Sequence, residues 1–175
     1  MTQSKYLSKI STPQLKEMGH GCLESCPELT DIDMAMLETM GDNCFSYTGC
    51  KSISMPLLRN MGKRCFYACV DLTDINMPML ETMGDNCVDK CHNLKIINMP
   101  LLKKMGFACF FEPFKLVDVS MPLLEEMKGN NFYTVSSLER IEFPSLKTMR
   151  GGFNHSKLVT INMPQLKYMG HESFK

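Results

Sequence analysis

The chain has 175 residues, the usual length of a single domain with a sizeable core. Nineteen basic and nineteen acidic side chains give a formal net charge of zero. This balance argues against a nucleic-acid-binding protein, because phosphate binding needs a concentrated positive field, and it gives no reason to expect an anionic membrane surface as partner. No segment approaches the roughly 18 apolar residues of a membrane span, so membrane insertion is not expected.

The nine cysteines bear on the cellular compartment. Their number is odd, the chain is longer than most disulfide-rich secreted domains, and residues 1–10 contain no apolar run of signal-peptide length. These features favour reduced thiols in a cytoplasm-like compartment. The alternative is a mature or trimmed form of an exported protein.

A unit of about 22 residues recurs from Leu7 to Phe174, with the pattern L-x-x-I-x-M-P-x-L-x-x-M-G-x-x-C-F-x-x-C-x-x. Two copies are shortened, by one residue before Cys50 and by two residues around Gly151 and Gly152. One copy is too short to bury its own apolar side, so the copies must stack to form a continuous core. The pattern predicts a β-rich solenoid of about eight coils, one domain over residues 1–175, with copies that begin near positions 7, 29, 50, 72, 94, 116, 138 and 158.

Each copy predicts two short extended segments and a return arc. The L-x-x-I-x-M run ends in two-residue alternation, which is typical of a short strand. The proline that follows ends the strand because it has no N–H group. The L-x-x-M-G run predicts a second extended segment, whose glycine suits a tight corner and a positive φ angle. The C-F-x-x-C stretch is the return arc, and it is too short for a long helix.

The order L-x-x-I-x-[LM]-P, then L-x-x-[IM]-G-x-x-[AC]-F-x-x-C, resembles the BspA-like class of leucine-rich repeats over Leu7 to Phe174. The resemblance implies a right-handed solenoid with a parallel sheet on its concave face. It also implies a role in adhesion or protein recognition and a cell-surface or secreted location. The chain departs from the class where methionine replaces leucine or isoleucine, and where cysteine replaces alanine at Cys22, Cys44, Cys65, Cys87 and Cys109.

The methionine and cysteine columns are interpreted as core. The methionines should alternate inward with the isoleucines, and thioethers fill irregular gaps well; the alternative is a soft-metal or redox surface. Stacked cysteines also leave zinc and disulfide interpretations open, although C-x-x-x-C is not the usual ligand spacing and no histidine column accompanies it. We therefore expect no metal and no other cofactor.

The sequence offers no support for catalysis, and we expect no catalytic residues. The four histidines occupy scattered positions in the repeat, so no nucleophile is predictably paired with a base. The glycines belong to the repeat corner and form no phosphate-binding loop.

The positions that flank the isoleucine of each first segment form the predicted binding face. They should point to solvent, and they are mostly short polar residues with an acidic bias in the first six copies. Eight strands give a face roughly 35–40 Å long, ample for an interface of about 800 Å² per partner. The predicted ligand is a protein, with a carbohydrate as the alternative. The predicted binding residues are Asp31, Asp33, Ser52, Ser54, Asp74, Asn76, Asn98, Asp118, Ser120, Arg140 and Glu142.

Two other interpretations of this face remain open. One is a solvated sheet surface that stays polar for solubility. The other is a calcium site at Asp31, Asp33, Asp74 and Asp118, but these acids lie in alternate copies, and six to eight oxygen ligands must converge on one ion.

The second segment carries charges that alternate in sign from copy to copy until the last one. Stacked in register, each charge would face an opposite charge on the next coil. We interpret this alternation as a device that fixes the coil register and maintains solubility. The residues are Lys16, Glu38, Arg59, Glu81, Lys103, Glu125, Lys147 and Lys167.

Exposed aromatic residues predict a second contact surface. Clustered exposed aromatics are typical interface anchors; the alternative is that the rings pack on one another around the altered arc at Glu112 and Pro113. The predicted aromatic ridge consists of Tyr67, Phe107, Phe111, Phe114 and Tyr133.

Together these features predict a non-enzymatic protein-recognition scaffold, with adhesion as one form of that role. The alternative is a viral or surface assembly component. Solenoids normally need polar caps, and the repeats run nearly from end to end of the chain, so uncapped ends would allow copies to self-associate.

Overall fold

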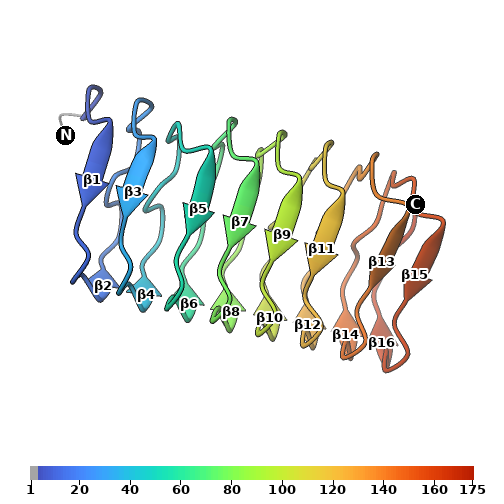
Figure 1. The fold of residues 1–175 in the computed structure, drawn as a ribbon. Helices are drawn as coiled ribbons and strands as arrows, with labels where there is room; N and C mark the ends of the chain where they lie inside the picture. Colours follow the sequence, from blue (N-terminus) through green and yellow to red (C-terminus); the bar gives the residue numbers. More distant parts are fainter. Residues whose placement is uncertain (1–3) are drawn as a thin grey trace.

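The computed structural model describes residues 4–175, which form eight coils stacked along one axis (Figure 1). Each coil has a three-residue first strand and a two-residue second strand. The first strands are β1 (Lys9–Ser11), β3 (Asp31–Asp33), β5 (Ser52–Ser54), β7 (Asp74–Asn76), β9 (Ile96–Asn98), β11 (Asp118–Ser120), β13 (Arg140–Glu142) and β15 (Thr160–Asn162). The second strands are β2 (Glu17–Met18), β4 (Thr39–Met40), β6 (Asn60–Met61), β8 (Thr82–Met83), β10 (Lys104–Met105), β12 (Glu126–Met127), β14 (Thr148–Met149) and β16 (Tyr168–Met169).

All strand pairing is parallel and joins equivalent strands of adjacent coils. The second strands form one continuous eight-stranded sheet from β2 to β16. The first strands form three separate sheets, β1–β3, β5–β7–β9–β11 and β13–β15. The register is fixed by the repeat, since Ile10 lies opposite Ile32 and Met18 opposite Met40. The predicted solenoid is confirmed, with seven complete turns between β1 and β15 and most of an eighth beyond.

The core runs along the inside of the coils. In the inner coils the leucine column is fully buried, as at Leu58, Leu80 and Leu102. Phenylalanines of the arc stack face to face, with 5.3 Å between the ring centroids of Phe45 and Phe66. The core interpretation of the methionines is confirmed, because twelve of them are buried: Met18, Met34, Met40, Met55, Met61, Met77, Met83, Met99, Met105, Met121, Met127 and Met149.

A glycine follows the second strand in six of the eight coils, and none of these glycines has the positive φ angle predicted for it. Within residues 4–175, only Gly21 and Gly151 among the glycines have positive φ. The column is needed because adjacent coils approach closely at this corner. A β-carbon at Gly41 would lie 2.9 Å from the carbonyl carbon of Gly19, and one at Gly84 would lie 2.8 Å from that of Gly62. Each glycine therefore makes room for the coil beside it.

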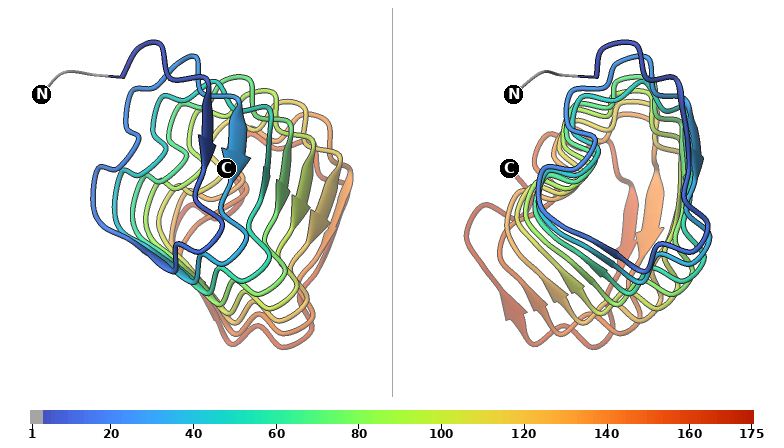
Figure 2. Two further views of the ribbon diagram at one scale, coloured as in Figure 1. Left: turned by 60° about the vertical axis from the view of Figure 1, so that its left-hand side comes forward. Right: turned by 90° about the vertical axis from the view of Figure 1, so that its left-hand side faces the viewer.

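Positive φ angles occur instead in the return arc, on fifteen residues other than glycine. Five consecutive coils carry them as pairs four residues apart, such as Asn43 with Tyr47 and Asn86 with Lys90. The left-handed conformation costs roughly 1–2 kcal/mol at such a residue. Intercoil hydrogen bonds offset this cost, since the amide of Asn43 donates to the Lys63 carbonyl at 2.8 Å. Viewed along the axis, the arc side of the coils turns inward (Figure 2).

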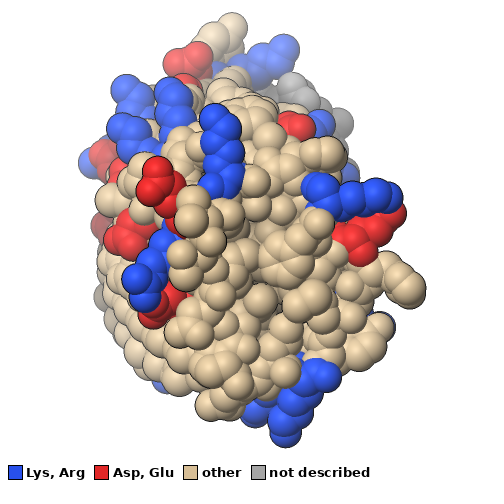
Figure 3. Space-filling model, turned by 90° about the vertical axis from the view of Figure 1, so that its right-hand side faces the viewer, with Lys and Arg blue, Asp and Glu red and all other residues tan. Residues whose placement is uncertain are grey.

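The two end coils are less completely covered than the inner ones. Tyr168, Met169 and Phe174 of the last coil are each about half exposed, whereas Met149, one coil inward, is fully buried. The space-filling view of this end shows a largely uncharged surface with Lys, Arg, Asp and Glu gathered toward its rim (Figure 3). Separately, residues 4–175 include no helix with the length and apolar character that a membrane crossing requires.

Burial of the methionines predicts their order of oxidation. Met169 is 48% exposed and should be the first to be oxidised in mild peroxide. The twelve buried methionines should stay reduced, because the oxidant cannot reach their sulfur atoms. Mass spectrometry of proteolytic peptides measures each site. In urea the difference should disappear. Equal oxidation rates for Met77 and Met169 in the folded protein would contradict the burial of the core column.

Candidate functional site

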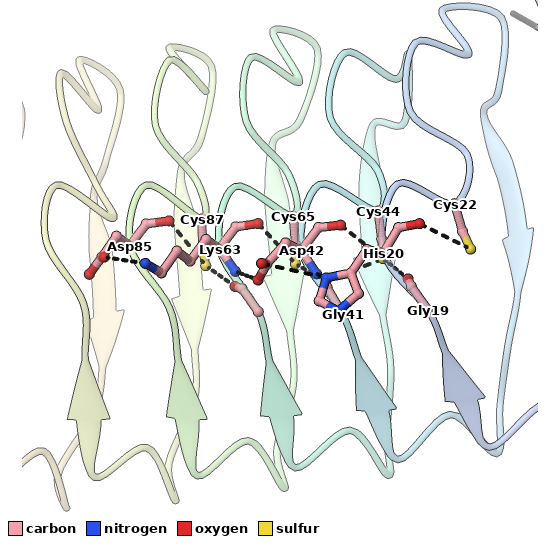
Figure 4. Close-up of polar contacts among 11 residues, drawn as sticks. Gly19, His20, Cys22, Gly41, Asp42, Cys44, Lys63, Cys65, Asp85 and Cys87 are labelled. Atoms are coloured by element: carbon pink, nitrogen blue, oxygen red, sulfur yellow. Dashed lines mark hydrogen bonds and ion pairs between the residues drawn. The ribbon is translucent and has the colours of Figure 1, made fainter. Parts of the chain in front are cut away.

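A column of cysteines runs along the corner after the second strands (Figure 4). Four of its five thiols donate a hydrogen bond to a glycine carbonyl of the preceding coil. The Sγ–O distances are 2.9 Å from Cys44 to Gly19, 3.1 Å from Cys65 to Gly41, 2.8 Å from Cys87 to Gly62 and 3.0 Å from Cys109 to Gly84. These four cysteines are fully buried, whereas Cys22 at the head of the column is exposed. The column therefore joins the coils as small buried donors.

Burial controls the ionisation of Cys87 in this column and of Cys91 in the arc. Removal from water raises the pKa of Cys87 and of Cys91 well above the ordinary value. The neutral thiol is the form that donates to a carbonyl, and the thiolate is the form that binds metals. No three His, Cys, Asp or Glu side chains within residues 4–175 are placed to share one metal ion. What the structure describes is thus a packing role for the cysteines.

Asn131 occupies the cysteine position of the sixth coil and makes more bonds than a thiol can. Its amide nitrogen donates to the carbonyl of Gly106 at 2.8 Å and to that of Lys128 at 2.7 Å. Its carbonyl oxygen accepts from the Cys109 amide at 2.7 Å. The side chain is fully buried, and its bonds to Gly106 and Cys109 are buried as well.

Surface charges form ladders along the second strands, as the alternating pattern predicts. Glu81 lies between two cations, and its hydrogen bond from Lys103 lowers the pKa of its carboxyl group. These pairs are exposed, so each contributes about 0–1 kcal/mol and acts mainly on register. The intercoil N–O distances are 3.5 Å for Lys16–Glu38, 3.2 Å for Arg59–Glu81, 2.9 Å for Lys103–Glu81 and 2.9 Å for Lys147–Glu125.

A second ladder, at the corner beside the cysteines, includes His20, Asp42, Lys63 and Asp85 (Figure 4). Nδ1 of His20 accepts from the Asp42 backbone amide at 3.0 Å, and Lys63 pairs with Asp85 at 3.5 Å. Asp42 also accepts from the Lys63 amide at 2.7 Å. The hydrogen bond from the Phe107 amide lowers the pKa of Asp85. The polar groups of these side chains bond to one another and to the backbone of the next coil, so they join adjacent coils.

All the predicted binding residues lie on the first strands, where they flank the inward isoleucine or valine and point away from the core. Eight of them are exposed, and Asp74, Asn98 and Ser120 are half-buried. Part of the face is internally paired: Asp31 with Lys9 at 2.6 Å, Asp33 with the Ser11 hydroxyl at 2.8 Å, and Asn98 with Asn76 at 3.0 Å. Arg140 and Glu142 pair within β13. The face between the two ends therefore has the most free polar groups.

The centre of the face holds a residue that the sequence-based set omits. Ile96 is 41% exposed and lies opposite Asp74 on β7 and opposite Asp118 on β11. Asp74 accepts from the neighbouring Thr73 hydroxyl at 2.5 Å. Asp118 has no side-chain hydrogen bond or ion pair within residues 4–175. An exposed aliphatic side chain between two carboxylates is thus the most distinctive chemistry on this face. Its signal in the sequence is an isoleucine in a column of polar residues.

The five aromatic residues of the predicted ridge fall into separate groups. Phe111 stacks on Tyr133 with 4.6 Å between ring centroids, and Phe114 stacks on His92 at 5.1 Å. Tyr67 pairs with Tyr47 in the preceding coil. Phe107 lies at the corner after β10, away from the arc, and is 44% exposed. Ring-on-ring packing accounts for Phe111 and Tyr133, whereas Phe107 stacks on no other ring within residues 4–175.

Asp89 is a feature that sequence reasoning missed. It occupies the same arc position as Tyr67 and Phe111 in the adjacent coils, and the residue is only 8% exposed. Oδ2 accepts from the side-chain Nδ2 of Asn86 at 3.3 Å, while Oδ1 is buried with no hydrogen-bond partner among the described residues. Desolvation raises the pKa of this carboxyl group. Asp89 therefore destabilises the arc when it is ionised.

Substitution of Asn131 tests the stacking of the corner. Asn131→Ala should lower the free energy of unfolding by about 2–4 kcal/mol, because it leaves three buried backbone groups unpaired. Asn131→Cys should lose less, because a thiol can still donate to Gly106. Urea denaturation followed by circular dichroism measures both. Equal losses for the two variants would show that the hydrogen bonds are not the cause.

Substitution of Asp89 tests the cost of its buried charge. Because its folded-state pKa is raised above the ordinary 3.8, the folded state binds the proton more tightly, and stability falls as pH rises through the interval between the two values. Asp89→Asn should therefore raise the free energy of unfolding by about 1 kcal/mol at pH 7, with the gain shrinking toward pH 3.8. Urea midpoints across this range measure the effect, and a gain independent of pH would contradict it.

Comparison with known proteins agrees with this geometry. A family profile described as "BspA type Leucine rich repeat region" matches residues 2–95 and 59–175, with six copies. A leucine-rich repeat protein from Bacteroides ovatus, solved by crystallography, shares the fold with a TM-score of 0.77 and 24% sequence identity. The match covers 95% of this chain and 45% of that one.

The crystal structure of the pneumococcal vaccine antigen PcpA matches with a TM-score of 0.37 and 15% identity, over 96% of this chain and 68% of that chain. This likeness is too low to carry an argument.

A comparison with curated protein sequences finds no match. Repeat scaffolds of this kind generally serve protein interaction and are generally non-enzymatic. The chain belongs to the BspA-type leucine-rich-repeat family.

Proposed function

We propose that the chain is a non-enzymatic recognition scaffold that binds a protein partner through the first-strand face. The observation that carries this proposal is the exposed Ile96 between Asp74 and Asp118 at the centre of the four-stranded sheet. Interface hot spots are central apolar anchors surrounded by polar groups that exclude water. The three side chains have that arrangement on the four-stranded sheet β5–β7–β9–β11.

The chemistry of this centre favours a basic segment of the partner. A lysine or arginine has an aliphatic stem that can cover Ile96 and a cationic end that can reach a carboxylate on either neighbouring strand, about 4.8 Å away. Asp118 has no competing cation within residues 4–175. The exposed Val117, beside Asp118, extends the apolar area. Partner binding should therefore weaken as ionic strength rises.

Capture experiments with three variants test this proposal. The immobilised wild-type chain should retain a protein from the source organism, and Ile96→Ser or the double variant Asp74→Asn, Asp118→Asn should retain it about tenfold less, because they remove the anchor or its charges. Phe107→Ser, which changes an equally exposed residue on another surface, is the control. Mass spectrometry quantifies the retained protein. Undiminished capture by Ile96→Ser would refute the first-strand face as the site.

A second candidate function is assembly through the solenoid ends. It is favoured by the half-exposed Tyr168, Met169 and Phe174 of the last coil and by a hollow of about 250 Å³ at the first coil, where Ile10, Leu15 and Leu23 are only partly covered. Stacking one end on the other would bury both surfaces as the inner coils bury theirs.

Light scattering over a wide range of concentrations tests this second candidate. If copies stack, the mean mass should rise with concentration, and Met169→Glu should keep the chain monomeric because it places a charge in the apolar end. Phe107→Ser again serves as the control. A constant monomer mass for the unaltered chain excludes end-to-end assembly.

A further inference from the structure

The shortened second coil opens a groove on the arc side of the solenoid. The residue lost before Cys50 brings Gly49 against the first coil so closely that a β-carbon there would overlap the carbonyl oxygen of Pro27. The backbone is thus drawn inward beside Pro27, while Tyr47, two residues earlier, stays on the surface. Tyr47 is 45% exposed and has a φ angle of 60°.

Tyr47 lines two neighbouring hollows on the surface. One, of about 480 Å³, is lined by Lys5, Ser25, Pro27 and Tyr47. The other, of about 160 Å³, continues past Pro27 and Tyr47 to Gly49, Val70 and Asp71. Since the two hollows share Pro27 and Tyr47, they form one groove that crosses the first three coils. The larger hollow is largely open to solvent.

The lining of the groove includes one aromatic ring, that of Tyr47, and the apolar residues Pro27, Ala68 and Val70. The Tyr47 and Tyr67 rings meet edge to face, with 5.5 Å between centroids and 75° between planes. The Arg64 guanidinium lies over the Tyr67 ring at 4.2 Å, which fixes the orientation of that ring. Val70 contributes a half-exposed aliphatic side chain. Such a groove, with the Tyr47 ring beside Pro27, suits rigid apolar rings in a ligand.

The two ends of the groove carry opposite charges. Lys5 lines one end and Asp71 the other. Neither forms an ion pair within residues 4–175. A ligand with complementary charge would therefore carry an acid toward Lys5 and a base toward Asp71, with its apolar part over Tyr47.

We propose that the groove around Tyr47 docks an extended, proline-containing segment of a partner protein, with an acidic residue toward Lys5 and a basic residue toward Asp71. A polyproline II segment is already extended before it binds, so little conformational entropy is lost, and its rings pack on aromatic side chains. The site is on the arc side, away from Ile96, so this inference and the first-strand proposal can each fail without the other.

The test uses a fluorescent, end-blocked peptide with a glutamate, a run of about six prolines and an arginine, roughly 19 Å of proline helix at 3.1 Å per residue. Fluorescence anisotropy should show saturable binding to the unaltered chain, and Tyr47→Ser should weaken it about tenfold or more. Phe107→Ser, matched in exposure, should leave it unchanged. Absence of saturable binding at millimolar concentration, or equal binding by Tyr47→Ser, overturns the proposal.

A second variant, Asp71→Lys, reverses one charge of the groove and distinguishes a loss of binding from a loss of folding. Asp71 is exposed, so Asp71→Lys should leave the urea midpoint unchanged. It should weaken the Glu–proline–Arg peptide about two- to fivefold and strengthen a peptide with glutamate at both ends by a similar factor. If the substitution acted only on the structure, the affinities for both peptides would change in the same direction. That outcome would overturn the assigned polarity of the groove.

Discussion

The close approach of adjacent coils is the constraint on which the rest of this structure depends. Each strand of two or three residues is far too short to be stable alone, and its hydrogen bonds go to the same position one repeat away. The corner glycines allow this approach, and the thiols of Cys44, Cys65, Cys87 and Cys109 add donors that reach across it. Stability therefore accumulates along the stack, since each coil contacts only its neighbours.

This constraint explains why the most frequent residues say least about function. A leucine, methionine or cysteine that recurs in every coil satisfies the same packing requirement each time. The residues that differ from their column are free to recognise something. Ile96 stands in a polar column, Tyr47 lies beside a shortened coil, and Asp89 replaces an aromatic residue. Of these, Ile96 and Tyr47 face solvent, so they are the ones placed to meet a partner.

The period made the stack and its core predictable. Because columns 22 residues apart must lie side by side, the buried Leu, Ile and Met columns, the outward polar face and the opposed charges such as Lys103 and Glu81 could all be inferred. The path of the arc could not, because a repeat fixes neighbours along the axis and not the backbone angles within a coil. The left-handed residues show this, since Arg64 and Ala108 have positive φ without any preference for it. Because the path of the arc was not predictable, neither the grouping of the aromatic residues nor the burial of Asp89 could be inferred from the sequence.

The unequal continuity of the two strand rows has a mechanical consequence. The second strands form one unbroken sheet along all eight coils, whereas the first strands are interrupted between β3 and β5 and between β11 and β13. When the molecule bends, the continuous row of second strands should resist extension, whereas the first-strand row can open at its two interruptions. Bending should therefore concentrate at these two places. The longest uninterrupted part of the first-strand row, β5 to β11, is the one that holds Ile96 between its two carboxylates.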